Sequence, residues 1–454
     1  MSDSDEEMSS AASATSGDVV TGVADVVVVD DDDDKVAVRS LPLANLFALF
    51  LGFGVRAWGG PVVQIDMMRE YFVTDAKWVT SAQFNRALAV YQVLPGPEAH
   101  ELCCYYGMLS RGRIGAVLAG LGFMLPGLCL MLLLSWLYDA FYRSALAMNH
   151  PDALKVQASF RGIQACVTAL VIRAVHRLGT QALSNSETKR VSAMLVGCAF
   201  CAAIASVIGI NFFIPLGVGG VANAVYEAGH LRARAWLWKA VAGAVLVLSV
   251  VGYILYRALA VGGASIELGA TGVATNPPEY WALFVIGLLA GLVTFGGAYT
   301  TIPYVRAETL VFLPTAVFLD AIALAQVIPS PLVMFVCFVG YMGRGIGGAL
   351  LMTLGVFLPS FSFTLIGHSL FERAVKLNAI RTFLDGVTAA VIGLVAFTAI
   401  ELVRDSVAIL PGSILIFVIA IGALYTIVSV WTPPAVILAS AIAGQVLCQT
   451  VVML

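Results

Sequence analysis

Long apolar runs without a charged side chain dominate the chain beyond the first forty residues. A helix needs about 20 mostly apolar residues to cross a bilayer, and several of these runs are long enough for two crossings. Gly and Pro cut many runs into half-length pieces, so broken helices are expected. The pattern predicts an all-α polytopic membrane protein with roughly 10–13 transmembrane spans. The clearest runs are 114–138, 191–226, 280–305, 321–343, 345–371 and 406–454.

The composition excludes an ordinary soluble protein. The 454 residues are 60% hydrophobic and 12% charged, with a mean hydropathy of +0.92. Soluble domains are about half apolar and about a quarter charged. The eight cysteines lie mostly in apolar segments, where a thiol packs as a small hydrophobic group, so they say little about the redox compartment.

The first forty residues differ from the rest of the chain. Residues 1–40 hold 11 of the 28 acidic and 2 of the 25 basic side chains, so the net charge of −3 becomes +6 without them. This composition predicts a disordered acidic tail, although residues 30–35 also resemble a protease-cleavage tag. No basic segment precedes an apolar one here. We therefore expect no cleavable signal peptide, and a first helix from Leu41 that serves as a signal-anchor.

Two stretches recur later in the chain with their Gly and Pro residues in the same order. GGPVVQIDMMRE at 59–70 aligns with GGAYTTIPYVRAE at 296–308, an offset of 237 positions. A weaker match pairs 161–163 with 385–387. The chain is therefore predicted to be two related halves. The strongest match sets Pro95, Pro97, Gly107, Gly112, Gly115, Ala116, Phe123 and Pro126 against Pro329, Pro331, Gly340, Gly345, Gly348, Ala349, Phe357 and Pro359.

Duplicated membrane halves with breaks at matching positions are typical of secondary transporters, whose broken helices meet near the bilayer midplane. We expect the repeats to be inverted, which requires an odd number of spans in each half. Four stretches rich in Lys and Arg are interpreted as loops, at 143–161, 173–190, 232–239 and 373–381, but they are too mixed to assign the two sides of the membrane. The predicted domains are a tail at 1–40, a first repeat at 41–258, a linker at 259–280 and a second repeat at 281–454.

Five ordered motifs carry a resemblance to a known family. They are G-G-P with Q-I (59–65), L-P-G-P-E (94–98), Y-x-G (105–107), G-x-x-G-A (112–116) and A-G-x-x-F-x-L-P-G (119–127), followed by a weaker second copy. Together they resemble the chromate ion transporter family in its long two-domain form. The resemblance covers essentially everything after the tail. It implies export of chromate from the cytoplasm, with chromate resistance as the result and sulfate as a look-alike anion.

The residue chemistry also favours an anion. Transporters offset the desolvation cost of a dianion with backbone N–H groups at half-helix ends and a few Arg or Lys side chains. Arg69 and Arg306 follow the glycine pairs, although snorkelling at the interface explains them equally well. Gln64 and Gln326 are amide donors near the breaks, or interhelical hydrogen-bond partners. The predicted substrate-binding residues are Gly59, Gly60, Gln64, Arg69, Pro95, Gly96, Pro97, Gly296, Gly297, Arg306, Gln326 and Ser330.

Glu98 directly follows the first Pro-Gly-Pro break and is the candidate for coupling. An intramembrane carboxyl group is a functional candidate by default, so Glu98 is protonated, paired with an arginine, or exchanges protons against the anion. Alternatively it caps the helix that begins there. The second copy has Leu332 and Phe335 at the equivalents of Glu98 and Glu101. We therefore expect any carboxylate role to be confined to the first half.

No catalytic or metal centre is expected. His100, Cys103 and Cys104 are soft ligands at helical spacing, but no second pair completes a zinc site. Cys198 and Cys201 are interpreted as packing residues. We expect a transporter and not an enzyme. Its expected partners are the chromate anion, or alternatively sulfate, and the lipid bilayer. No cofactor and no nucleic acid are expected. A plasma-membrane location is expected, a homodimer stays open, and the alternative functions are a transporter of sulfate or another oxyanion and an anion channel.

Overall fold

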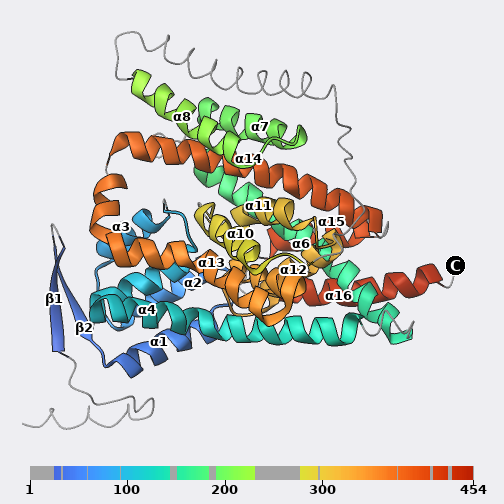
Figure 1. Cartoon of the computed structure of the whole chain (residues 1–454), viewed down its shortest axis with the longest axis horizontal. Coiled ribbons are helices and arrows are strands. Elements are labelled where there is room, and N and C mark those ends of the chain that lie inside the picture. Colours follow the sequence, from blue (N-terminus) through green and yellow to red (C-terminus); the bar gives the residue numbers. More distant parts are fainter. Residues whose placement is uncertain are drawn as a thin grey trace, which may run out of the picture.

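The computed structural model (Figure 1) describes residues 25–31, 34–58, 60–92, 94–143, 151–183, 191–230, 277–294, 297–375, 377–409, 413–427 and 432–452. Gly59 and Gly296, two predicted binding residues, lie outside the described residues, as do residues 259–276 of the predicted linker. The division into a tail, two repeats and a linker therefore stays a prediction.

Helices make up almost all of the described chain. They are α1 Leu43–Arg56, α2 Pro61–Arg69, α3 Ser81–Tyr91, α4 Glu98–Leu137, α6 Pro151–Ala182, α7 Ala193–Val207, α8 Phe213–His230, α10 Tyr280–Leu292, α11 Thr301–Thr309, α12 Thr315–Val327, α13 Phe335–Val375, α14 Asn378–Ile409, α15 Ser413–Thr426 and α16 Thr432–Val452. Four short helical turns join them: η1 Glu70–Asp75, η2 Tyr138–Arg143, η3 Ala298–Thr300 and η4 Leu332–Met334.

Four helical segments among the described residues are long and apolar enough to cross a membrane: Glu98–Ala140, Ala158–Ala182, Leu332–Ile366 and Ala379–Ser406. Six more apolar helices have only 10–17 residues, which is fewer than the about 20 that a crossing requires. An all-α polytopic membrane protein with broken helices, expected from the sequence, is thus confirmed.

The end of the predicted tail differs from the expected disordered chain. Strands β1 (Asp25–Asp31) and β2 (Asp34–Ser40) form an antiparallel hairpin in which Val28 lies opposite Ala37. Val is β-branched and favours extended backbone, and the four consecutive valines at 26–29 explain the strand. Residues 1–24 lie outside the described residues.

The two halves repeat the same helix pairing. Helix α1 packs against α4 in the first half, and α10 packs against α13 in the second. Gly54 and Gly291 are related by the 237-residue offset, and a side chain added to either would collide with the facing helix, at the backbone carbonyls of Phe123 and Val356 respectively. Both glycines are therefore needed for the same close approach of two helices.

Helices α4 and α13 each fold back on themselves at a matched glycine. Gly112 has φ 60° and Gly345 has φ 63°, a left-handed conformation that glycine adopts without steric cost. In α4 this turn brings Gly107 against the backbone of Gly115. Each helix therefore begins with a half-length segment that lies in the protein interior.

The last helices of the halves exchange partners. Helix α6 of the first half packs against α15 and α16. Helix α14 of the second half packs against α7 and α8, which lie at the top of Figure 1. The matched glycines mark both crossings: Gly162 of α6 touches Gly444, and Gly386 of α14 touches Gly219. Small residues allow this close helix contact in membranes.

The predicted loops at 143–161 and 173–190 are therefore wrong over much of their length. Helix α6 runs from Pro151 to Ala182 and includes Arg161, Arg173 and Arg177. The apolar residues between these arginines pack against the second half, and this burial outweighs the charges that marked the segment as polar.

Candidate functional site

The breaks after α1 and α10 have the same geometry. Gly60, the residue before α2, has φ 82°, and Gly297, the residue before η3, has φ 125°. Both values lie in the left-handed region that favours glycine. The 237-residue offset relates the two positions. Their glycine neighbours Gly59 and Gly296 lie outside the described residues.

Each break touches the Pro-x-Pro break of the other half. The Gln64 side chain is buried, and its Nε2 donates to the Ala57 carbonyl at 3.0 Å and to the Ser330 carbonyl at 3.1 Å. In the opposite sense, the Gly96 N–H donates to the Thr294 carbonyl at 2.9 Å. Segments about 200 or more residues apart along the chain are therefore joined by direct hydrogen bonds at the centre of the fold.

Half-helix starts at the Pro-x-Pro breaks supply polar groups. Pro97 precedes α4 and Pro331 precedes η4. The first N–H groups of a helix have no partner within it and carry partial positive charge. Ser330 is 4% exposed, and its hydroxyl has no hydrogen-bond partner among the described residues. A buried donor without a partner is costly, which marks Ser330 as a group able to bind a ligand.

Gln326 and Tyr299 connect the two breaks of the second half. Gln326 Nε2 donates to the Tyr299 hydroxyl at 2.9 Å. Tyr299 belongs to η3, directly after the Gly297 break, and Gln326 lies near the end of α12, just before Pro329. Both predicted glutamines thus make the hydrogen bonds between segments that the sequence left as an alternative to ligand binding.

Arg69 lies away from the breaks. It is at the far end of α2, a helix of nine residues that is about 13 Å long. Its guanidinium donates to Asn85 Oδ1 and lies over the Phe84 ring, 5.0 Å from the centroid. The structure therefore does not bring Arg69 together with Gly60, and its place in the binding set stays a prediction.

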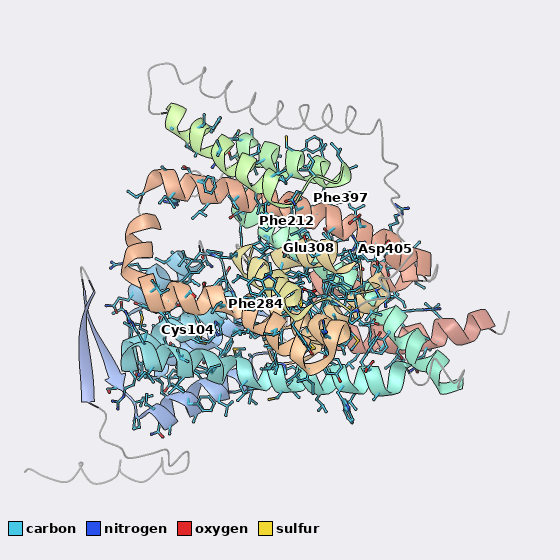
Figure 2. The ribbon with its side chains drawn as sticks, viewed as in Figure 1. Cys104, Phe212, Phe284, Glu308, Phe397 and Asp405 are labelled. Atoms are coloured by element: carbon cyan, nitrogen blue, oxygen red, sulfur yellow. The ribbon has the colours of Figure 1, made fainter. Side chains whose placement is uncertain are left out.

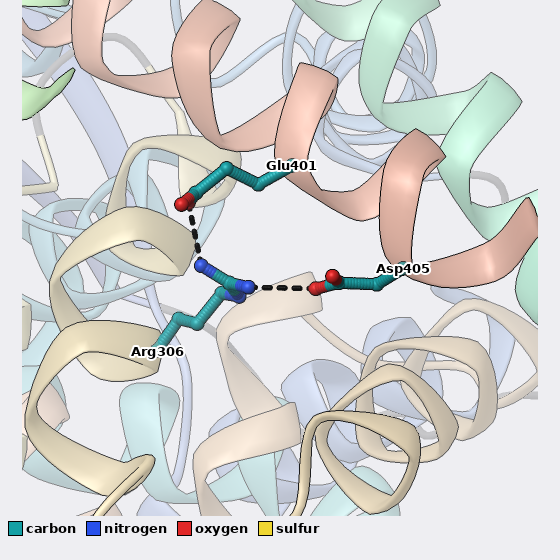
Figure 3. A network of polar contacts seen from close by, with 3 residues as sticks. All are labelled: Arg306, Glu401 and Asp405. Carbon is teal, nitrogen blue, oxygen red and sulfur yellow. Dashed lines mark hydrogen bonds and ion pairs between the residues drawn. The ribbon is translucent and has the colours of Figure 1, made fainter. Parts of the chain in front are cut away.

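Arg306 lies at the equivalent position near the end of α11. Its guanidinium donates to Glu401 and, at 2.7 Å, to Asp405 (Figure 3). The two carboxylates are four residues apart and share one face of α14. Figure 2 labels Asp405 on α14 and Glu308 two residues beyond Arg306. In this conformation protein carboxylates compensate the charge of Arg306, so its role as an anion ligand also stays a prediction.

Two carboxyl groups lie beside the first Pro-Gly-Pro break. Glu98 is 9% exposed and begins α4. Glu101 is fully buried, and neither of its oxygens has a hydrogen-bond partner among the described residues. A side chain added at Gly96 would collide with the Glu101 carboxyl group. Both carboxyl groups therefore line the backbone break, and Glu98 is also placed where it favours the helix dipole.

His100 and Cys104 do not form a metal centre with a third ligand. The ring of His100 is fully buried, and Nδ1 lies 2.9 Å from Ser360 Oγ. Cys104, labelled in Figure 2, has its Sγ 3.8 Å from the same nitrogen. Among the described residues no group of three His, Cys, Asp or Glu side chains is arranged to hold a metal ion.

Asp320 is a buried carboxyl group that the sequence analysis missed. It is 1% exposed in α12 and accepts hydrogen bonds from the Tyr138 hydroxyl at 2.8 Å and from Gln164 Nε2 at 2.9 Å. Both donors belong to the first half. Buried carboxyl groups therefore occur in both halves, and the expected confinement of a carboxylate role to the first half stays a prediction. The signal was an acidic residue within an otherwise apolar helix.

Comparisons with known proteins agree with one another. The family described as Chromate transporter matches residues 44–266 and 281–445. The chain is 42% identical over 405 residues to a chromate transport protein of Pseudomonas aeruginosa, covering 88% of this chain and 91% of the relative. It is 28% identical over 382 residues to a chromate transport protein of Cupriavidus metallidurans, covering 83% and 86%. No solved structure matches.

Proposed function

The chain belongs to the chromate transporter family, and we propose that it carries chromate across the membrane and out of the cell. Export of this toxic oxyanion would confer chromate resistance. Because export from a cell acts at its outer boundary, the proposal includes a location in the plasma membrane. The name of the Pseudomonas aeruginosa relative supports chromate as the substrate.

The observation that carries the proposal is the reciprocal contact between breaks of the two halves. Gln64 bonds to Ser330, and Gly96 bonds to Thr294. A tetrahedral dianion loses much hydration energy inside a membrane protein. Helix N-termini offset this loss with N–H groups and partial positive charge, and four breaks gathered at one place provide several such groups. A rocking motion of one repeat against the other would open this place to each side in turn.

We assign the backbone and side chains at the breaks to the anion site: Gly59, Gly60, Gln64, Pro95, Gly96, Pro97, Gly296, Gly297, Gln326 and Ser330. The Ser330 hydroxyl supports this assignment because it is buried without a partner. The prolines contribute by ending the preceding helix and fixing the start of the next. The glycines allow the backbone to approach the ligand.

We also assign Arg69 and Arg306 to the anion site, but in a conformation that differs from the one described above. Arg306 would have to leave Glu401 and Asp405 before it could bind chromate. Such an exchange of a carboxylate for an oxyanion suits guanidinium, which binds both in the same planar geometry. Arg69 would have to leave the neutral Asn85 and the ring of Phe84.

Two energy sources fit export. Moving one charge through 100 mV is worth about 2.3 kcal/mol, so a dianion leaving a negative-inside cell gains roughly twice that. Proton exchange is the second source, and Glu98 is its proposed site because its carboxyl group lies at the break and begins a half-helix. The two sources differ in their response to a pH gradient.

Chromate flux into proteoliposomes of defined membrane potential tests the proposal. We expect flux that follows the potential, saturates with chromate and is reduced by sulfate in proportion to the affinity of the site for sulfate. Expression in a chromate-sensitive cell should lower chromate accumulation. Absence of flux at both signs of the potential, from folded protein, would overturn the proposal. Unitary currents in a planar bilayer would instead identify an anion channel.

A further inference from the structure

A buried carboxyl group joins the two halves away from the breaks. Asp320 of α12 is 1% exposed and accepts hydrogen bonds from the Tyr138 hydroxyl at 2.8 Å and from Gln164 Nε2 at 2.9 Å. Tyr138 begins η2 after α4, and Gln164 lies in α6, so both donors come from the first half. We call these three residues the Asp320 cluster. It ties one helix of the second half to two elements of the first.

The Asp320 cluster lies on helices that also lead to the breaks. Asp320 precedes the end of α12 at Val327 by seven residues, which is about 10 Å along a helix. A side chain added at Gly127 of α4 would collide with Ser330. Tyr138 follows Gly127 by eleven residues, about 16 Å along a helix. The cluster is therefore a second contact between the halves, separate from the junction of the breaks.

The Asp320 carboxyl group has neutral partners. Tyr138 and Gln164 are uncharged donors, and no Lys, Arg or His side chain forms an ion pair with Asp320 among the described residues. Helices α4, α6, α13 and α16 and the turn η4 pack against α12. The other titratable side chains on the neighbouring described stretches, none of which bonds to Asp320, are Cys129, Asp139, Arg161, Cys166, Cys337 and Tyr341.

The cluster also holds an acceptor for a protonated carboxyl group. A buried carboxylate without a cation is costly, and binding a proton removes its charge. Gln164 Oε1 is buried and has no hydrogen-bond partner among the described residues. Rotation of this amide by half a turn presents Oε1 to Asp320, and a protonated carboxyl group then donates to it. The same rotation removes the 3.1 Å bond from Gln164 Nε2 to the Ala316 carbonyl.

We propose that Asp320 binds a proton during transport and that this proton loosens the contact between the two halves. The inference rests on the proposed function, whose rocking motion would move Asp320 relative to Tyr138 and Gln164. With Asp320 ionised, both donors make charge-assisted hydrogen bonds, which are roughly twice as strong as neutral ones. The proton enters from water as the halves begin to move apart, and it returns to water when they close. Glu98 stays the proposed site of proton exchange against the anion.

The alternative is a purely structural contact. Polar side chains hydrogen-bond across helices in membranes, and a carboxyl group with that role alone would keep one protonation state. A neutral replacement would then lower the stability without changing the pH dependence of flux. The pH profile, together with a direct signal of the carboxyl proton, therefore separates the two roles.

The first test measures chromate flux in proteoliposomes over a range of pH, with the same pH on both sides so that no proton gradient acts. Wild-type flux should fall as the pH rises through the midpoint at which Asp320 ionises. Asp320→Asn should keep the flux of the acidic plateau at every pH, because an amide gains no charge. The matched control is the exposed Asp75→Asn, which should follow the wild type. Chromate itself binds protons equally in every sample, so the difference between variants is the readout.

Two further variants keep the carboxyl group and change its partners. Tyr138→Phe and Gln164→Met each remove one donor to the ionised carboxylate, which makes ionisation harder. The midpoint should therefore move upward by about one to two pH units, the scale of one hydrogen bond to a charged group. Infrared spectroscopy of the purified full-length protein needs no transport. A carbonyl band of a protonated carboxyl group should disappear as the pH rises, and this band should be missing from Asp320→Asn.

The same pH profile in the wild type and all three cluster variants, with no carboxyl band missing from Asp320→Asn, would overturn this inference alone. Flux that depends on Na⁺ instead of pH, and loses this dependence in Asp320→Asn, would also overturn the proton as the occupant. A wild type that transports no chromate, but whose carboxyl band titrates and is lost in Asp320→Asn, would overturn the proposed function and support the proton site.

Discussion

Gln64 of the first half donates a hydrogen bond from its side-chain amide to the backbone carbonyl of Ser330 in the second half, 266 residues later. The same nitrogen also donates to Ala57, at the end of the helix before the break. One buried amide therefore holds the break of the first half against the Pro-Ser-Pro break of the second. Any movement of one half against the other at this point must change the bond to Ser330.

Replacing Gln64 by Met should weaken this junction. Loss of two buried hydrogen bonds that leave carbonyls unpaired costs about 1–3 kcal/mol, and we expect a lower melting temperature and slower chromate flux. The control is Gln92→Met, because Gln92 is exposed. Thermal unfolding in detergent and proteoliposome flux are the measurements. Wild-type stability and flux in Gln64→Met would show that the contact is not required.

Alanine at Gly60 or Gly297 should destabilise the protein because of the positive backbone φ angle alone. No atom lies within 4 Å of an added side chain at Gly60, so space is available, but its φ of 82° disfavours every L-residue. We expect a loss of about 1–2 kcal/mol in the free energy of unfolding and reduced flux. Gly217→Ala is the matched control, since Gly217 also has space around it but lies within helix α8. There alanine should be neutral or stabilising.

Removing the Arg306 guanidinium distinguishes a role in anion binding from a purely structural role in the ion pair. If Arg306 exchanges its carboxylates for the anion during transport, Arg306→Gln raises the KM for chromate about tenfold. The double variant Glu401→Gln with Asp405→Asn frees the guanidinium and should lower the KM. Loss of thermal stability in Arg306→Gln with an unchanged KM would assign Arg306 to the ion pair of Figure 3 alone.

Replacing Glu98 by Gln tests whether proton movement at this residue is coupled to chromate transport. The amide has the shape of the carboxyl group but exchanges no proton. If protons move against chromate at Glu98, flux in the wild type should rise when the compartment that receives chromate is made acidic, and this response should disappear in Glu98→Gln while the response to membrane potential stays. The exposed Glu70→Gln is the control. A pH response that survives in Glu98→Gln would leave helix capping as the role of this residue.

The positions of the helix breaks could be predicted from the sequence because Gly and Pro change the backbone at their own positions. The glycine pairs and the Pro-x-Pro motifs recur at matching positions. Gly60, Gly297, Pro97 and Pro331 each lie directly before a helix or helical turn, as their backbone chemistry requires. Arg111 and Arg344 each precede a left-handed glycine, and Arg111 donates to the Leu41 carbonyl as Arg344 donates to that of Pro278.

The rest of the site depends on tertiary contacts. The partner exchange of α6 and α14 between halves decides which helix faces the breaks, and no local pattern encodes it. Arg173 and Arg177 were therefore interpreted as part of a polar loop, although both belong to helix α6. Asp320 was missed because its partners, Tyr138 and Gln164, come from the other half.

The position of bound chromate tests the central claim most directly. An experimental structure of the protein in chromate, by cryo-electron microscopy or by anomalous scattering from chromium, would locate the anion. We predict one anion between the breaks of the two halves, near Ser330 and the first turn of α4. Chromate bound elsewhere in the protein, with the junction between Gln64 and Ser330 empty, would contradict the account.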